Sequence, residues 1–155
     1  PDSAVDDVIF FMEGEGRLGR KVKAGFYDYD EKGKRQGYWS GIGAQYERLE
    51  DQPDLTEVQN RLMFAQVLEA VRALEEGVLE DIREGDVGAI LGWGFAPWSG
   101  GPFAWLDIVG AAWAAEQCDT LEEKFGARFA CPQLLREMAD DVETFYERFS
   151  PAQAA

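Results

Sequence analysis

The chain has 155 residues, which is enough for about one ordinary domain or two small ones. Its composition is globular, with 46% hydrophobic and 13% aromatic residues, and 30 acidic against 15 basic residues give a net charge of −15. Nucleic acids and anionic membrane surfaces are also negatively charged and would repel this chain, so we expect neither as a partner.

The absence of His and the spacing of the two Cys residues exclude several kinds of catalytic and metal-binding site. The sequence contains no His, which excludes His-based triads, zinc sites and general bases. Cys118 and Cys131 form no Cys-x-x-Cys pattern, so we interpret them as two reduced thiols and expect no metal site. No apolar run approaches the roughly 20 residues that span a bilayer, and no signal sequence is recognisable. We therefore expect a cytoplasmic protein; the initial Pro1 indicates either a processed product or a piece of a longer one.

The first segment can be interpreted in two ways. Acidic residues in the first turn and the apolar spacing predict a short helix over residues 2–12, although residues 8–12 could instead form a strand. Residues 14–19 then match Gly-x-Gly-x-x-Gly, the dinucleotide-binding spacing. The strand-like residues 26–29 follow too soon for a crossover helix of about a dozen residues. We therefore interpret the glycines as a helix end and a turn.

Alternating aromatic residues on both sides of a Gly-containing turn predict a small β-ribbon near residues 25–39. The same region is basic: residues 17–35 hold seven of the 15 basic residues and only three acidic ones. Such a basic segment in an acidic chain either pairs with nearby acidic helices, as charge runs usually do, or receives an anionic ligand.

The strongest helix signal covers residues 55–79, after a plausible boundary at residues 50–53. Asp54 is placed to cap it, with Glu57 three residues later. Arg72 and Glu76 have the i,i+4 spacing of a supporting pair. The apolar face is expected to contain Leu62, Val67, Leu68, Val71, Leu74 and Val78.

Residues 92–102 read Gly-Trp-Gly-Phe-Ala-Pro-Trp-Ser-Gly-Gly-Pro. Flexible linkers lack such aromatic residues, so we predict an ordered, aromatic-filled turn between two helices. The helix before it is expected over residues 86–91 with Asp86 as N-cap, and the helix after it over residues 103–109, ending at Gly110.

The remaining elements are predicted in the same way. Residues 111–125 should form a helix with Trp113 and Leu121 inward and Gly126 as C-cap. Another helix should run from Pro132 to residue 138, residues 144–146 should pack back onto the body, and residues 150–155 should form a frayed tail. Asp107 is the one acidic residue in an apolar setting, where helix capping or buried hydrogen bonding is favoured over catalysis.

The sequence therefore predicts an all-α protein of about five to seven helices with a small β-ribbon near residues 25–39. It also resembles a known family. Residues 61–78, 86–102 and 106–110 resemble the C-terminal helical domain of the 3-hydroxyacyl-CoA dehydrogenases, and most closely its second copy in multifunctional fatty-acid β-oxidation enzymes. Gly-Phe-Tyr-Asp-Tyr at residues 25–29 resembles the segment that closes the first copy, and residues 129–146 resemble the family's C-terminal end.

The resemblance implies two parts: residues 1–50, with the end of a first helical copy, the ribbon and a linker, and residues 51–155, a second helical domain. It implies that an upstream domain of the same polypeptide supplies the NAD site and a catalytic His–Glu pair. This chain, which lacks His, would help close the acyl-CoA cleft of that parent enzyme without catalysing the reaction alone or binding a cofactor itself. The parent would oxidise 3-hydroxyacyl-CoA by hydride transfer to NAD.

The resemblance also suggests site residues. Asn60 corresponds to an Asn near the active site in the first copy, but in a second copy we expect it to be structural. We hypothesise that Arg20, Lys21 and Lys23 hold an acyl-CoA phosphate in the intact protein. An alternative is a stand-alone acidic interaction module, anchored by an aromatic patch of Trp93, Phe95, Trp98 and Trp105. A third interpretation is a stand-alone CoA-ester binder that uses the basic segment.

Overall fold

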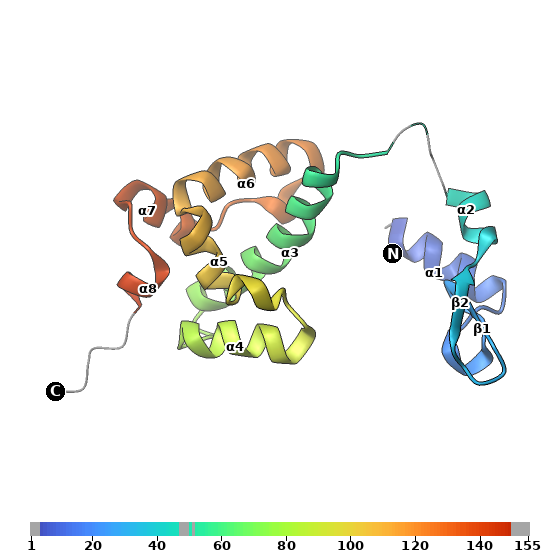
Figure 1. Cartoon of the computed structure of the whole chain (residues 1–155). Coiled ribbons are helices and arrows are strands. Elements are labelled where there is room, and N and C mark those ends of the chain that lie inside the picture. Colours follow the sequence, from blue (N-terminus) through green and yellow to red (C-terminus); the bar gives the residue numbers. More distant parts are fainter. Residues whose placement is uncertain (1–3, 47–49, 51, 150–155) are drawn as a thin grey trace. The chain divides into compact units, whose positions relative to one another are not determined.

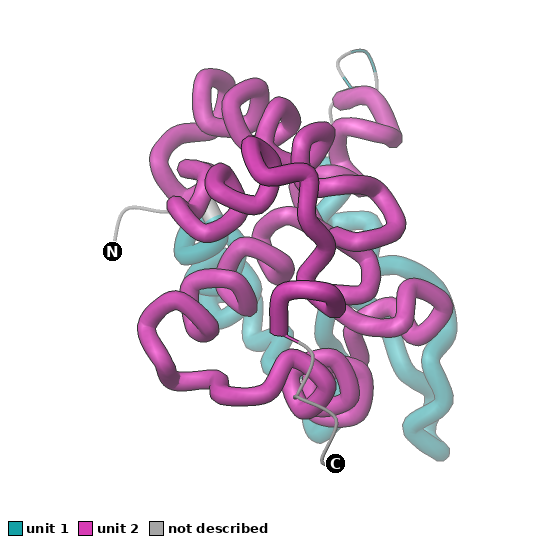
Figure 2. Tube along the Cα trace, turned by 90° about the vertical axis from the view of Figure 1, so that its left-hand side faces the viewer, with its two compact units in different colours: residues 1–52 teal, residues 53–155 magenta. Residues whose placement is uncertain are grey.

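The computed structural model describes residues 4–46, 50 and 52–149. The chain divides into two compact units, Pro1–Gln52 and Pro53–Ala155, shown in teal and magenta in Figure 2. The predicted all-α fold with a small β-ribbon is confirmed. The tail predicted for residues 150–155 lies outside the described residues.

Unit 1 combines helices with a two-stranded antiparallel sheet. Its elements are α1 (Ala4–Gly14), a 3-10 turn (Arg20–Val22), β1 (Tyr27–Tyr29), β2 (Arg35–Tyr38) and α2 (Ser40–Tyr46). The predicted ribbon is confirmed, because Tyr27 pairs with Tyr38 and Tyr29 with Arg35. Helix α2 was not predicted from the sequence.

The first segment is helical, so the alternative of a strand over residues 8–12 is wrong. Gly14 is the last residue of α1, and Gly19 immediately precedes the 3-10 turn. A dinucleotide-binding loop requires a strand before it and a helix after it. Neither is present here, so the glycines form a helix end and a turn, as predicted.

Unit 2 is a bundle of six helices in its described residues (Figure 1). They are α3 (Leu55–Glu75), α4 (Ile82–Trp93), α5 (Pro102–Val109), α6 (Ala111–Phe125), α7 (Gln133–Asp141) and α8 (Phe145–Arg148). Helix α5 contacts α3, α4, α6 and α8, which makes it the centre of the bundle. Its Phe103 and Leu106 are buried, and the Phe103 ring packs against Phe145 of α8.

Helix α3 begins where the sequence predicts, and the Asp54 carboxylate accepts a hydrogen bond from the Glu57 backbone N–H at 3.1 Å. It ends at Glu75, four residues before the predicted end, because Gly77 turns the chain with φ of +69°. The helix buries Phe64, Val67, Leu68 and Val71. The predicted face was therefore partly wrong, since Leu62 and Val78 are exposed. Likewise, Arg72 pairs with Glu69 rather than with Glu76.

The predicted start of the next helix was also wrong. Helix α4 begins at Ile82, and its N-cap is Asp81, whose side chain accepts a hydrogen bond from the Arg83 backbone N–H at 2.9 Å. Asp86 instead lies inside α4 and is buried. An acidic side chain within a helix and inside a core requires partners from other elements.

The later elements agree with the sequence prediction, except that α7 ends at Asp141, three residues after the predicted end. Helix α6 has the predicted bounds and ends at Gly126, which has φ of +88°. Leu121 is buried, but Trp113 remains 37% exposed while its ring contacts those of Phe64 and Trp105. Pro132 precedes α7, and Phe145 is fully buried, which confirms that residues 144–146 pack back onto the body.

Candidate functional site

The buried Asp86 carboxylate joins three helices of unit 2. It accepts hydrogen bonds from the backbone N–H of Phe103 at 2.8 Å and of Ala104 at 3.1 Å, both in the first turn of α5. It also accepts one from the Tyr146 hydroxyl of α8 at 2.9 Å. Helix α5 has no side-chain cap at its own N-cap residue, Gly101. Asp86 therefore caps α5 from within α4.

The surroundings of Asp86 act on its ionisation in opposite directions. Burial raises the pKa of its carboxyl group above the usual value, and the three hydrogen bonds that it accepts offset this only in part. Burial and the hydrogen bond to Asp86 together raise the pKa of Tyr146 to about 12, so the tyrosine hydroxyl stays protonated and donates. The pair is thus a donor and an acceptor fixed at the helix junction.

Gly101 allows the start of α5 to approach Asp86. Its backbone has φ of +118° and ψ of 176°, a conformation that only glycine adopts readily. A Cβ atom at this position would lie 2.4 Å from the Asp86 carboxyl carbon and Oδ1. Glycine is therefore required at position 101 for two reasons: the backbone conformation, and the lack of space for a Cβ atom beside the Asp86 carboxylate.

Two further carboxylates, neither of them buried, also accept hydrogen bonds at the starts of remote helices, one of which, α8, has a local cap at Thr144 as well. Asp107 of α5 accepts hydrogen bonds from the backbone N–H of Phe145 at 2.6 Å and of Tyr146 at 3.0 Å, at the start of α8. This confirms the capping role predicted for Asp107. Glu75, at the end of α3, accepts a hydrogen bond from the Leu134 backbone N–H at 2.6 Å, at the start of α7. Three helices are thus capped by acids that lie far away in the sequence.

Sequence reasoning assigned Asp86 as a cap of the wrong helix and did not single out Glu75 as a capping residue. The available signal was that the helix starts at Pro102 and Pro132 have no adjacent capping side chain. Within the described residues, no buried side-chain nitrogen or oxygen lacks a hydrogen-bond partner. The same residues contain no group of three or more side chains suited to hold a metal.

Asn60 lies in α3 and faces α6. Its side-chain amide donates a hydrogen bond to the Gln117 side-chain carbonyl at 3.3 Å. The neighbouring Arg61 places its guanidinium over the Phe125 ring, 4.0 Å from the ring centre. Both residues thus join α3 to α6.

The four aromatic residues considered as a patch do not share one surface. Phe95 and Trp105 are 1% and 7% exposed and belong to the core, where Trp105 packs edge-on against Phe64. Trp93 and Trp98 are 60% and 78% exposed. Trp93 donates a hydrogen bond from its indole Nε1 to the Gln66 side chain at 3.1 Å. It also borders an apolar groove of about 790 Å³ between α3 and α4.

In unit 1, the basic segment is arranged around the hairpin. Arg20 donates a hydrogen bond from Nε to the Gly33 carbonyl at 3.1 Å, and Lys21 and Lys23 are exposed. Lys23 has φ of +57° at the end of the 3-10 turn. Arg17 forms an ion pair with Asp28 at 2.5 Å. The segment therefore pairs locally at Arg17 and leaves its four lysines, Lys21, Lys23, Lys32 and Lys34, at the surface.

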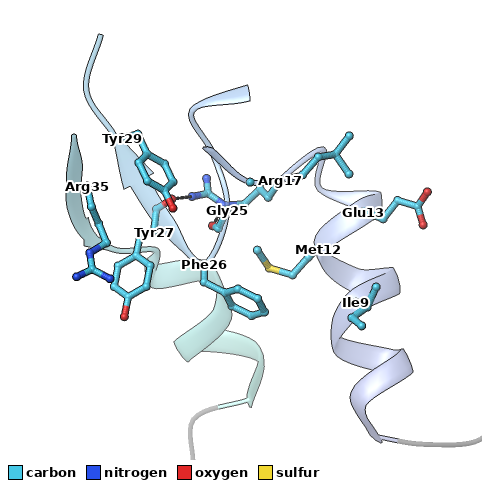
Figure 3. Close-up of a pocket in the computed structure, with 11 residues that line it drawn as sticks. Ile9, Met12, Glu13, Arg17, Gly25, Phe26, Tyr27, Tyr29 and Arg35 are labelled. Atoms are coloured by element: carbon cyan, nitrogen blue, oxygen red, sulfur yellow. Dashed lines mark hydrogen bonds between the residues drawn. The ribbon is translucent and has the colours of Figure 1, made fainter. Parts of the chain in front are cut away.

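An open cavity of about 560 Å³ lies between α1 and the hairpin (Figure 3). Met12 and Phe26 contribute to its apolar lining, while Arg17 crosses it to donate hydrogen bonds to the backbone carbonyls of Gly25 and Tyr27. Arg35 lies over the Tyr27 ring, 4.5 Å from its centre. Arg17 thus holds the hairpin to α1, and the cavity remains lined mainly by apolar groups.

These observations define unit 2 as an all-helical domain in which carboxylates from one helix, among them the buried Asp86, accept hydrogen bonds from the start of another. The family described as "3-hydroxyacyl-CoA dehydrogenase, C-terminal domain" matches residues 58–146, which is more than half of the chain. The chain belongs to this family. The match confirms the resemblance found in the sequence, and it covers α3 to α7 and the start of α8.

One relative extends the likeness into unit 1. The fatty acid oxidation complex subunit alpha of Shewanella amazonensis (strain ATCC BAA-1098 / SB2B) is 39% identical over an alignment of 140 residues, which covers 87% of this chain. The matched region is 19% of that protein, so the chain spans about a fifth of the length of this relative. None of the helices in the described part of the chain is long and apolar enough to cross a membrane.

Proposed function

We propose that this chain is the C-terminal helical portion of an NAD-dependent 3-hydroxyacyl-CoA dehydrogenase of fatty-acid β-oxidation. The observation that supports this most directly is the family match over residues 58–146. In this proposal, an upstream domain of the same cytoplasmic polypeptide binds NAD and provides the catalytic His. The present chain packs against that polypeptide and helps to close the acyl-CoA cleft, and it does not turn over substrate alone.

The surface of unit 1 supports the proposed upstream partner. Met12 and Ile42 are the only large apolar side chains of its described residues that are buried. Many others are at least 45% exposed: Val5, Ile9, Phe10, Leu18, Val22, Phe26 and Tyr38. So much exposed apolar surface on one small unit is typical of a surface that another part of a protein covers. An assignment of residues 1–50 as the end of a first helical copy accounts for this exposure.

The proposal predicts a difference between this chain and the polypeptide in its source cells. We expect the isolated 155-residue chain to show no NADH oxidation with acetoacetyl-CoA above a blank. An antibody against the chain should detect a polypeptide several times larger than 17.3 kDa, and this polypeptide, once immunoprecipitated, should oxidise NADH with the same substrate. Turnover by the isolated chain, or a native band at 17.3 kDa, would contradict the proposal.

The basic segment leads to a second prediction, which assigns Arg20, Lys21 and Lys23 to an acyl-CoA phosphate. Reversing all three charges to Glu in the full-length enzyme should weaken binding of a CoA ester by at least about 10-fold, since exposed cation–phosphate contacts each contribute modestly. A matched control reverses Lys32 and Lys34, which lie at the tip of the hairpin. Isothermal titration with acetoacetyl-CoA measures both affinities. Equal affinity of the triple variant and the unmodified enzyme would refute the assignment.

A further inference from the structure

The apolar groove between α3 and α4 of unit 2 has the dimensions of a short helix. Its volume is about 790 Å³, and apolar atoms form most of its lining. The α3 wall extends from Ala65 to Ala73, and the α4 wall extends from Glu84 to Trp93. At about 1.5 Å per residue, each wall is roughly 12–14 Å long, which corresponds to two or three turns of a helix. A helix that lies between two others is a common occupant of such a groove.

Two glycines of the α4 wall have no explanation within the chain. Neither Gly88 nor Gly92 has a positive φ, and a Cβ atom at either position would meet nothing within 4 Å. Gly85 differs, because a Cβ atom there would lie 2.6 Å from Leu79 and 2.8 Å from Phe103. Glycine inside a helix is destabilising relative to alanine, and it suits positions that another backbone approaches closely. Gly88 and Gly92 therefore indicate close approach of a segment from outside the chain.

Large apolar side chains are exposed at both ends of the groove. Val78, in the connection between α3 and α4, is 76% exposed, and Trp93, the last residue of α4, is 60% exposed. The Trp93 indole Nε1 donates a hydrogen bond to the Gln66 side chain, which holds the ring in place beside the groove. An apolar surface that ends in an ordered, exposed aromatic ring is typical of a surface that a partner covers.

The charges on the groove indicate which kind of helix would fit. Glu69 of α3 and Glu84 of α4 line it and are exposed, whereas no Lys or Arg is among its lining residues. Glu69 pairs with Arg72, but Glu84 forms no ion pair within the described part of the chain. Residues 53–155 hold 19 acidic and 7 basic residues, so the surrounding field is also negative. An occupant with basic side chains is therefore complementary to this surface.

We propose that the groove between α3 and α4 is covered by an amphipathic helix that carries Lys or Arg beside its apolar face. The helix comes from the part of the same polypeptide that lies outside residues 1–155. This inference rests on the function proposed above, and it adds the surface and the chemistry of the contact. The region matched in the fatty acid oxidation complex subunit alpha is 19% of that protein, so about four-fifths of a polypeptide of that size lies elsewhere. A segment of the same polypeptide has a high effective concentration and covers the destabilising glycines permanently.

A photo-crosslinker in the groove identifies the occupant. p-Benzoylphenylalanine replaces Trp93 in the full-length polypeptide, and the crosslinked peptides are identified by mass spectrometry after irradiation and digestion. We expect an intramolecular crosslink to a peptide outside residues 1–155 that has Lys or Arg beside an apolar helical face. The same group in place of Trp98, which is 78% exposed and does not line the groove, should not give this crosslink. A crosslink to a second copy, to a separate protein or to an acidic segment, or no crosslink beyond those of the control, would overturn the proposal.

Gly88→Leu tests the same contact through stability. In the isolated chain the new side chain points into open space and favours the helix, so the thermal midpoint of unfolding should stay equal or rise. In the full-length polypeptide it would occupy the space of the proposed helix, so the midpoint should fall by several degrees. Ala112→Leu, at an exposed position of α6, is the control and should change both proteins alike. An equal effect of Gly88→Leu in both proteins would contradict the proposal.

The charge of the occupant is tested by Glu84→Lys. In the full-length polypeptide this variant should lower the midpoint more than Glu123→Lys does, which makes the same change of charge at an exposed position of α6. Equal effects of the two variants would show that the occupant is not basic at Glu84.

Failure of this inference can be distinguished from failure of the proposed function. An active polypeptide several times larger than 17.3 kDa that gives no crosslink from the groove would retain the dehydrogenase assignment and refute only the helix contact. A native polypeptide no larger than this chain would refute both.

Discussion

Replacing Asp86 with Ala is expected to lower the free energy of unfolding of unit 2 by about 3–5 kcal/mol. The substitution removes the acceptor for the backbone N–H groups of Phe103 and Ala104 and for the Tyr146 hydroxyl. Each buried donor left without an acceptor costs about 1–3 kcal/mol, and the α5 start has no other side-chain cap. Urea unfolding followed by tryptophan fluorescence measures the change.

Two variants separate this effect from ordinary helix capping. Asp54→Ala removes a local cap from α3, which lies at an exposed helix end, and should cost only about 1 kcal/mol. Asp86→Asn keeps one acceptor oxygen but turns an amide N–H₂ group toward donors. Its loss of unfolding free energy should therefore fall between those of Asp86→Ala and Asp54→Ala. If Asp86→Ala and Asp54→Ala had equal effects, Asp86 would not be holding the helix junction together.

The second large effect is expected at Gly101, where Gly101→Ala should cost about 4 kcal/mol or more. The residue must keep φ of +118°, and the added methyl carbon would lie 2.4 Å from atoms of the buried Asp86 carboxyl group. Strain in this backbone region costs about 1–3 kcal/mol, and the overlap forces either α5 or Asp86 to move. Urea unfolding of the variant gives the loss directly.

Gly126→Ala is a matched control for this substitution. Gly126 has a similar backbone, with φ of +88° and ψ of −176°, but a Cβ atom there meets nothing within 4 Å. The decrease in unfolding free energy of Gly126→Ala should therefore reflect backbone strain alone, about 1–3 kcal/mol. A Gly101→Ala variant no less stable than Gly126→Ala would show that α5 does not depend on close approach to Asp86.

Local signals in the sequence predicted the elements whose ends are set by nearby residues. Asp54 and Gly126 lie next to the helices that they begin and end, and the bounds of α6 were predicted correctly. Helix α2 was missed because its seven residues include two glycines, which disfavour helix. Its Ile42 is buried within unit 1, so tertiary packing stabilises what propensity does not.

The carboxylate junction could not be predicted, because its partners are remote in the sequence. Asp86 is 17 residues from Phe103 and 60 from Tyr146. The sequence suggested that Asp86 begins a helix, whereas the true N-cap, Asp81, lies five residues earlier. Only the placement of α5 and α8 shows the role of Asp86. In the Gly-rich turn, no periodicity distinguishes buried Phe95 from exposed Trp93, so four aromatic residues were grouped that the fold separates.

The carboxylate caps also determine how unit 2 can form. Glu75 accepts a hydrogen bond from Leu134 of α7, 59 residues later, and Asp107 accepts one from Phe145 of α8, 38 residues later. Helices α5, α7 and α8 are short, and isolated helices of such length are barely stable in water. Each is therefore stabilised by packing against an earlier helix that also supplies an acceptor for its first turn. Unit 2 should consequently fold in a single cooperative step. During synthesis, α3 and α4 should become stably packed only after the residues of α5, α7 and α8 have been made.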